Sequence, residues 1–333
     1  MEEYLVEIKD LRLSFFTPVG EVKALNGIDI RVKAGEVLGI VGESGSGKSV
    51  SAYTLMGLVP HPGRVTGGSA FFGGRRIDKM SEKEMLKIRG KEESIIFQDP
   101  LTSLNPVYTI GNQICEVILL HTDRGKTKAK ERAIELLRLV GINEPEKRMK
   151  QYPHELSGGM RQRVMIAIAL ACEPKLLIAD EPTTALDVTI QAQILELMME
   201  LKNKFDTSII MITHDLGIVS QMCDNIAVMY GGKVVEYGTA DDIFYNPRHE
   251  YTKGLLNSIP KLEEGHKERL VPIEGTTPDM LNLPKGCPFA PRCANCMKVC
   301  LEYMPPITNI ENSHISACWL IQKEDEEGVR FDG

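Results

Sequence analysis

The chain has 333 residues, a formal net charge of -7 at pH 7, 43% hydrophobic residues and 26% charged residues. This length suffices for one large domain with an extension or for two domains. The composition is that of an ordinary globular protein, and the negative charge offers no basic face, so nucleic-acid binding is disfavoured.

Neither the N-terminal residues nor the longest apolar run indicates a secreted or membrane-spanning chain. The first residues, "MEEYLVEIKD", are acidic and lack the basic start and apolar core of a signal peptide. The longest apolar run, "VMIAIALAC" at 164–172, is about half of the roughly 18 residues that suggest a membrane span. We therefore expect a protein of the cytoplasm with reduced thiols, whose membrane connection runs through another polypeptide.

Short β-branched, apolar runs that alternate with helical patterns predict a mostly parallel sheet flanked by helices. The predicted strands cover residues 36–41, 94–97, 175–180 and 208–213. Polar or glycine-rich residues follow each of them, and open α/β sheets hold their ligands at this edge. A mainly helical stretch at about 100–165 predicts a helical subdomain inserted between the second and third strands.

The helical stretch contains one amphipathic helix with a clear stop. Its apolar face is formed by Ala133, Leu136, Leu137 and Val140, and Gly141 follows. Further on, residues 225–238 predict two short strands joined at Gly231-Gly232. Prolines, scattered charge and clustered cysteines begin after about residue 245, so we expect one domain at 1–245 and a separate C-terminal extension at 246–333.

A phosphate-binding loop is predicted between the first strand and a helical run. The segment "GESGSGKS" has the spacing G-x-x-x-x-G-K-[ST] in the required strand–loop–helix context. Its backbone N–H groups and the helix N-terminus would bind a phosphate, Lys48 would reach the β- and γ-phosphates, and Ser49 would ligate Mg²⁺. The predicted nucleotide-binding residues are Gly42, Glu43, Ser44, Gly45, Ser46, Gly47, Lys48 and Ser49.

Two acidic residues end the third predicted strand, "KLLIADEP". Asp180 at the strand end would hold the metal shell, and Glu181 could polarise an attacking water. An Asp-Glu pair alone is more often a solvated turn. Because the chain also has a phosphate loop, a role in nucleotide hydrolysis is favoured here.

The octapeptide "LSGGMRQR" at 156–163 resembles the signature sequence of the ATP-binding-cassette (ABC) family, and further motifs follow in that family's order. The resemblance implies an ABC-type P-loop ATPase of the α/β class with an inserted helical subdomain, here with a cysteine-rich extension. It places the Q-loop at Gln98, the signature at Ser157, Gly158 and Gly159, Walker B at Asp180 with Glu181, the D-loop at Asp187 and the switch histidine at His214.

The resemblance also implies how these residues act. Glu181 would be the base, with Lys48, Gln98 and His214 at the γ-phosphate, and Ser49, Gln98 and Asp180 around Mg²⁺. Each signature would close on ATP held by a second ATPase subunit, so that hydrolysis depends on dimer closure. Strand alternation favours Phe15 as the adenine-stacking aromatic, with Phe16 as the alternative.

Finer patterns resemble the ATPase subunits of dipeptide and oligopeptide importers, whose relatives carry nickel. They include "FQDPLTSLNPVYTIGNQI" and "NPRHEYTKGLLNSIP". The resemblance implies a peripheral subunit at the cytoplasmic face of the membrane, paired with a like or different ATPase beneath two permeases that an extracytoplasmic binding protein feeds. Import of nickel or another small solute, and a nontransport iron-sensing ATPase, are the alternatives.

The extension contains five cysteines in the pattern C-x5-C-x2-C-x3-C-x17-C. Disulfides are disfavoured in a reducing compartment, so zinc, an iron–sulfur cluster and no metal remain open from the residues alone. The peptide-importer resemblance implies a [4Fe–4S] cluster on Cys287, Cys293, Cys300 and Cys318, with zinc as the alternative. Cys296 departs from that pattern. Because the extension shows little helix or strand pattern, we expect a structural role for the metal.

Overall fold

The computed structural model describes residues 4–184, 186–258 and 272–322. Parts of the expected extension, at 259–271 and 323–333, lie outside the described residues. The chain divides into two compact units. The first unit comprises Met1–Arg31, Val37–Asp78 and Thr213–Gly333, and the second comprises Val32–Glu36 and Lys79–Ile212.

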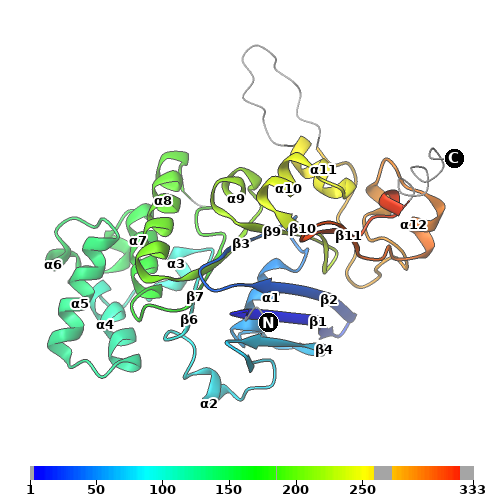
Figure 1. Cartoon of the computed structure of the whole chain (residues 1–333). Helices are drawn as coiled ribbons and strands as arrows, with labels where there is room; N and C mark the ends of the chain where they lie inside the picture. The colour runs from blue at the N-terminus through cyan, green and yellow to red at the C-terminus, as the bar shows by residue number, and fades with distance from the viewer. Residues whose placement is uncertain (1–3, 185, 259–271, 323–333) are drawn as a thin grey trace, which may run out of the picture. The chain divides into compact units, whose positions relative to one another are not determined.

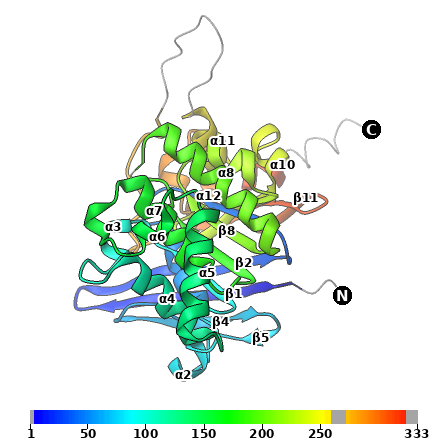
Figure 2. The same cartoon turned by 90° about the vertical axis from the view of Figure 1, so that its left-hand side faces the viewer.

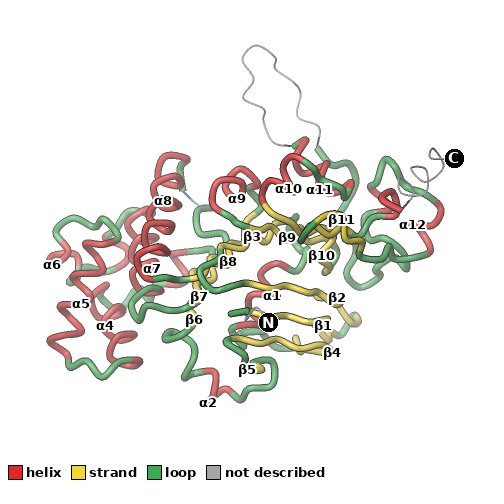
Figure 3. Tube along the Cα trace, in the orientation of Figure 1, coloured by secondary structure: helices red, strands yellow, loops and turns green. Residues whose placement is uncertain are grey.

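The first unit contains an antiparallel sheet in the order β2-β1-β4-β5; Figure 1 labels β2, β1 and β4, and Figure 3 also labels β5. Its strands are β1 (Val6–Thr17), β2 (Gly20–Val32), β4 (Gly63–Phe72) and β5 (Arg75–Arg76). Buried Val6, Ile8, Leu11 and Leu13 supply the apolar face of β1, and a register shift between Lys9 and Leu13 interrupts its alternation. This sheet was not among the predicted elements.

A second group of strands in the first unit has the order β11-β12-β10-β9-β3. The strands are β3 (Val37–Val41), β9 (Asn225–Tyr230), β10 (Lys233–Thr239), β11 (Thr308–Glu311) and β12 (His314–Ser316). β3 and β9 are parallel, whereas β10, β12 and β11 follow as antiparallel neighbours. The predicted hairpin at 225–238 is confirmed, and the extension adds two strands to its edge.

The helices of the first unit are short. They are α1 (Lys48–Leu55), α9 (Leu216–Met222), α10 (Ala240–Tyr245), α11 (Glu250–Asn257) and α12 (Lys298–Glu302). Most of residues 272–322 form loops (Figure 3). A buried hydrogen bond links this segment to the preceding strands, since His314 Nε2 lies 2.9 Å from Glu236 Oε1 and both side chains are fully buried.

The second unit holds three parallel strands, β6 (Glu93–Ile96), β7 (Leu176–Asp180) and β8 (Ser208–Thr213). Every residue of β7 and β8 is buried, as expected for parallel strands covered on both faces. These strands confirm the predicted runs at 94–97, 175–180 and 208–213 to within one residue.

The helices of the second unit include α4 (Ile110–His121), α5 (Lys126–Leu139), α7 (Gly158–Ala169) and α8 (Val188–Phe205), with short α2 (Glu82–Met85), α3 (Pro100–Ser103) and α6 (Pro145–Arg148). Figure 2 shows α4 beside α5. The predicted apolar face of α5 is buried, and Gly141 follows it with φ +74°. None of the helices within the described ranges is long and apolar enough to cross a bilayer.

Candidate functional site

The phosphate loop lies between β3 and α1, as predicted. Gly47 is the N-cap of α1 with φ +103°, a left-handed conformation that a side chain would strain. Lys48 is buried, and its Nζ donates to the carbonyl oxygens of Gly42 at 2.6 Å and of Glu43 at 2.9 Å. The backbone of the loop therefore surrounds the Lys48 ammonium group. This group lies at the N-terminus of α1, and a helix N-terminus favours anions.

Residues of the C-terminal extension contact this loop. The Arg292 guanidinium pairs with the Glu43 carboxylate through Nη1–Oε2 at 2.5 Å and Nη2–Oε1 at 3.0 Å. The Tyr251 hydroxyl accepts a hydrogen bond from the Glu43 backbone N–H at 2.8 Å. Sequence patterns did not predict these contacts, because Arg292 stands 249 positions after Glu43 and belongs to no phosphate-binding motif.

The second unit brings together the predicted Q-loop and Walker B residues. Gln98 Nε2 donates to Glu181 Oε2 at 2.7 Å, and Thr184 Oγ1 donates to the same oxygen at 3.0 Å. Glu181 has φ +47°, a strained conformation for a residue with a side chain, and its N–H donates to the Ile212 carbonyl oxygen of β8 at 2.9 Å. Hydrogen bonds thus hold both the Glu181 backbone and its carboxylate.

Asp180 is buried, with 3% of its surface exposed, at the last position of β7. The remaining predicted residues of the second unit begin helices. Ser157 is the N-cap of α7 and accepts from Met160 N at 3.4 Å, and Asp187 is the N-cap of α8 and accepts from Ile190 N at 3.0 Å. Gly158 is exposed and Gly159 half-buried at the start of α7, so the signature presents N–H groups at a helix N-terminus.

Three predicted residues of the first unit lie outside the phosphate loop. His214 is exposed directly after β8. Phe15 is half-buried on β1 opposite Gly63, whereas Phe16 is 38% exposed with the Arg64 guanidinium 4.0 Å from its ring centroid. Either phenylalanine remains a candidate for stacking on a base, so this prediction stays open.

The four cysteines that resemblance selected line one cavity in the first unit. Cys287, Cys293, Cys300 and Cys318 surround a space of about 20 Å³, together with His249 and Phe289, whereas exposed Cys296 does not line it. The chain folds back here because Cys287 N donates to the Cys300 carbonyl oxygen at 2.8 Å. Only glycine fits at 286, since a Cβ there would lie 2.1 Å from that oxygen.

Four thiols are the donor type that structural zinc sites and iron–sulfur clusters use. Burial raises the pKa of the Cys287 thiol to about 12 and that of Cys293 to about 11. The thiols of Cys287 and Cys293 are therefore protonated at neutral pH, and a bound cation is what would convert them to thiolates. As the side chains stand in the described part of the chain, no three His, Cys, Asp or Glu residues are grouped closely enough to hold a metal ion.

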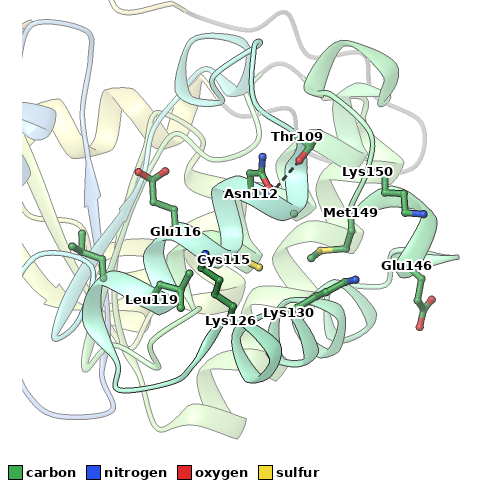
Figure 4. Close-up of a pocket in the computed structure, with 12 residues that line it drawn as sticks. Thr109, Asn112, Cys115, Glu116, Leu119, Lys126, Lys130, Glu146, Met149 and Lys150 are labelled. Atoms are coloured by element: carbon green, nitrogen blue, oxygen red, sulfur yellow. Dashed lines mark hydrogen bonds between the residues drawn. The ribbon is translucent and has the colours of Figure 1, made fainter.

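The second unit also has a large open pocket of about 990 Å³ among its helices. Figure 4 shows its lining from α4, α5 and the turn at α6. Leu119 and Leu120 line it beside charged residues, and Leu120 is 73% exposed. The predicted helical subdomain thus has a partly apolar surface next to lysine and glutamate side chains.

Comparison with known families covers both predicted regions. Residues 25–184 match the family described as ABC transporter, and residues 235–300 match the oligopeptide/dipeptide transporter C-terminal region. The oligopeptide transport ATP-binding protein OppD of Bacillus subtilis is 56% identical over 321 residues, which cover 96% of this chain and 90% of that protein. The dipeptide transport ATP-binding protein DppD of the same organism is 51% identical over 328 residues, 98% of each chain.

Solved structures agree with the fold. The dimeric bacterial ABC transporter cassette MJ0796 superposes with a TM-score of 0.64 at 26% identity, over 71% of this chain and 98% of that one. The structure of cbiO1 from Clostridium perfringens, part of the ABC transporter complex cbiONQ, has a TM-score of 0.63 at 30% identity, over 74% and 92%. The predicted fold class is confirmed.

Proposed function

Since this chain belongs to the family of ABC transporter ATP-binding subunits and is an ABC-type ATPase, we propose that it energises the uptake of di- or oligopeptides across the cytoplasmic membrane. One observation carries the proposal: the similarity to peptide transport ATP-binding proteins extends over 96% of the chain, through the extension as well as the cassette. Cassettes of many other transporters would share the first region alone.

In the first unit, the loop Gly42–Ser49 would hold the triphosphate. Its N–H groups and the N-terminus of α1 favour the phosphates, and Lys48 would exchange its two carbonyl acceptors for phosphate oxygens. His214 would contact the γ-phosphate. Ser49, Gln98 and Asp180 would hold Mg²⁺, which neutralises charge on the phosphate oxygens.

Glu181 would act as the general base that takes a proton from the attacking water. The hydrogen bonds that Gln98 and Thr184 donate to Oε2 orient its carboxylate. Through the same hydrogen bond, a displacement of the Q-loop at Gln98 would change the position of the Glu181 carboxylate.

A second ATPase subunit would complete each site. The exposed N-terminus of α7 at Ser157, Gly158 and Gly159 is suited to an anion, and we assign it to the γ-phosphate of ATP bound by the partner. Asp187, which caps α8, would lie at the same interface. The dimeric state of the MJ0796 cassette supports this arrangement.

We assign the pocket among α4, α5 and α6 to contact with two transmembrane permease subunits. Its exposed Leu119 and Leu120 offer apolar surface, and Lys126 and Lys130 add polar contacts at the edge. The subunit would then be peripheral, at the cytoplasmic face, with the extracytoplasmic binding protein acting through the permeases.

We also propose a [4Fe–4S] cluster on Cys287, Cys293, Cys300 and Cys318, with zinc as the alternative. The support is that these four thiols face one cavity and Cys296 does not. Such a cluster would supply four bonds that join Cys287, Cys293 in the turn before α12, Cys300 within α12 and Cys318 after β12, and so stabilise a region poor in helix and strand.

The test is reconstitution of the chain with its permeases and binding protein in vesicles. We expect ATP hydrolysis and uptake of a labelled tripeptide to rise together when the binding protein and peptide are present. Stimulation by nickel and not by peptide would contradict peptide import and favour nickel import. Hydrolysis without any co-purifying permease would favour a nontransport ATPase.

A further inference from the structure

Arg292 uses its whole guanidinium group in one network around the phosphate loop. Nη1 and Nη2 form the fork with Glu43 described above, and Nη1 also donates to Tyr230 Oη at 3.2 Å. Nε donates to the Glu274 carbonyl oxygen at 2.9 Å and Nη2 to that of Ile273 at 3.1 Å. All five N–H donors of the side chain therefore have acceptors.

The surroundings make this pair stronger than a surface ion pair. The Arg292 side chain is 5% exposed and that of Glu43 is 26% exposed. Tyr230 and Tyr251 pack beside it with ring centroids 4.5 Å apart, and Phe289 lies 5.3 Å from the Tyr230 ring. Low exposure and two parallel charge-assisted hydrogen bonds make such a contact more stabilising than an exposed ion pair.

Glu43 needs this partner because of where it stands. The loop binds a ligand with up to four negative charges, and a bare carboxylate on its second residue would repel that ligand. Arg292 cancels this charge, while its bonds to Ile273 and Glu274 connect the loop to the extension. The same side of the loop borders a cavity of about 230 Å³, which Glu43–Ser46 line together with Thr277, Pro278 and Met280.

We propose that Arg292 is a positioning residue of the ATP site: it neutralises Glu43 and holds the phosphate loop in its ATP-binding form, so that the C-terminal extension contributes to ATP affinity. The residue does not touch the nucleotide itself. It acts through Glu43, which makes the two residues thermodynamically coupled.

The test is a double-mutant cycle on the full chain, read by calorimetric titration with Mg·ATP. Arg292→Gln should weaken binding by about tenfold, within the roughly 5–150-fold range of typical couplings. Arg292→Lys keeps the charge and loses the fork, so the loss should be about threefold. In the Glu43→Gln background, Arg292→Gln should change affinity by less than about twofold, because the repelling carboxylate is gone.

Rescue by Glu43→Gln separates charge compensation from a merely structural role, which would persist in both backgrounds. Arg76→Gln is the matched control, because Arg76 forms a similar fork with Asp78 in the same unit but outside the loop. Its affinity should equal that of the wild type. An equal loss for Arg292→Gln with and without Glu43→Gln would overturn the proposal. If Arg292→Gln does not fold, wild-type affinity in Arg292→Lys would overturn it as well.

Discussion

Replacing Glu181 by Gln should abolish hydrolysis while ATP binding is retained. Gln has the same length as Glu, so it can keep the strained backbone at φ +47°, and its amide oxygen can accept the two hydrogen bonds that Glu181 Oε2 now accepts from Gln98 and Thr184. It cannot accept a proton from water. General base catalysis contributes about 10²–10⁴ in rate, so the barrier should rise by roughly 3–5 kcal/mol.

The assay is phosphate release at saturating Mg·ATP, together with calorimetric affinity for Mg·ATP. With its partner ATPase present, the variant should also accumulate as an ATP-bound dimer in size-exclusion chromatography. Glu196→Gln, at an exposed position of α8, is the matched control and should hydrolyse ATP at the wild-type rate. A Glu181→Gln variant that turns over within about threefold of the wild type would refute the assignment of the base.

Three further changes test the extension and the helical pocket. His314→Phe removes a fully buried hydrogen bond to Glu236 and should lower the free energy of unfolding by about 1.5–3 kcal/mol in urea titrations; an unchanged midpoint would contradict that anchor. Cys287→Ser should lose most iron and acid-labile sulfide from protein purified without oxygen, whereas Cys296→Ser should retain both; equal contents would reject the ligand set. Leu120→Asp should abolish permease co-purification while Mg·ATP affinity stays at the wild-type value, and intact co-purification would place the permease contact elsewhere.

Elements made by a local pattern were predictable, and those made by distant pairing were not. The strands β7 and β8 are continuous apolar runs because both of their faces are covered, so sequence alone located them. The alternation in β1 is broken where Asp10 takes φ +42° and the register with β4 shifts. β12 has only three residues, and the bond that fixes it joins His314 to Glu236 across 78 positions.

The candidate site divides along the same line. The phosphate loop is a local backbone structure whose glycines and lysine stand at fixed spacing, so a short motif suffices to predict it. The hydrogen bond between Gln98 and Glu181 follows from neighbouring strand ends, since β6 and β7 are parallel partners. No spacing rule leads from Glu43 to Tyr251 or Arg292, because those contacts exist only once the extension has folded.

Glu43, the glutamate in "GESGSGKS", is the loop residue that contacts the C-terminal extension. The pattern G-x-x-x-x-G-K-[ST] leaves this position open, and a carboxylate beside a triphosphate is an electrostatically poor choice on its own. It becomes acceptable when a buried guanidinium faces it, as Arg292 does. The predicted boundary near residue 245 follows composition, whereas the contacts of Tyr251 and Arg292 with Glu43 continue across it. Disorder around Cys293, the residue after Arg292, would therefore disturb the phosphate loop, because the Arg292 side chain would lose its hydrogen bonds to Glu43.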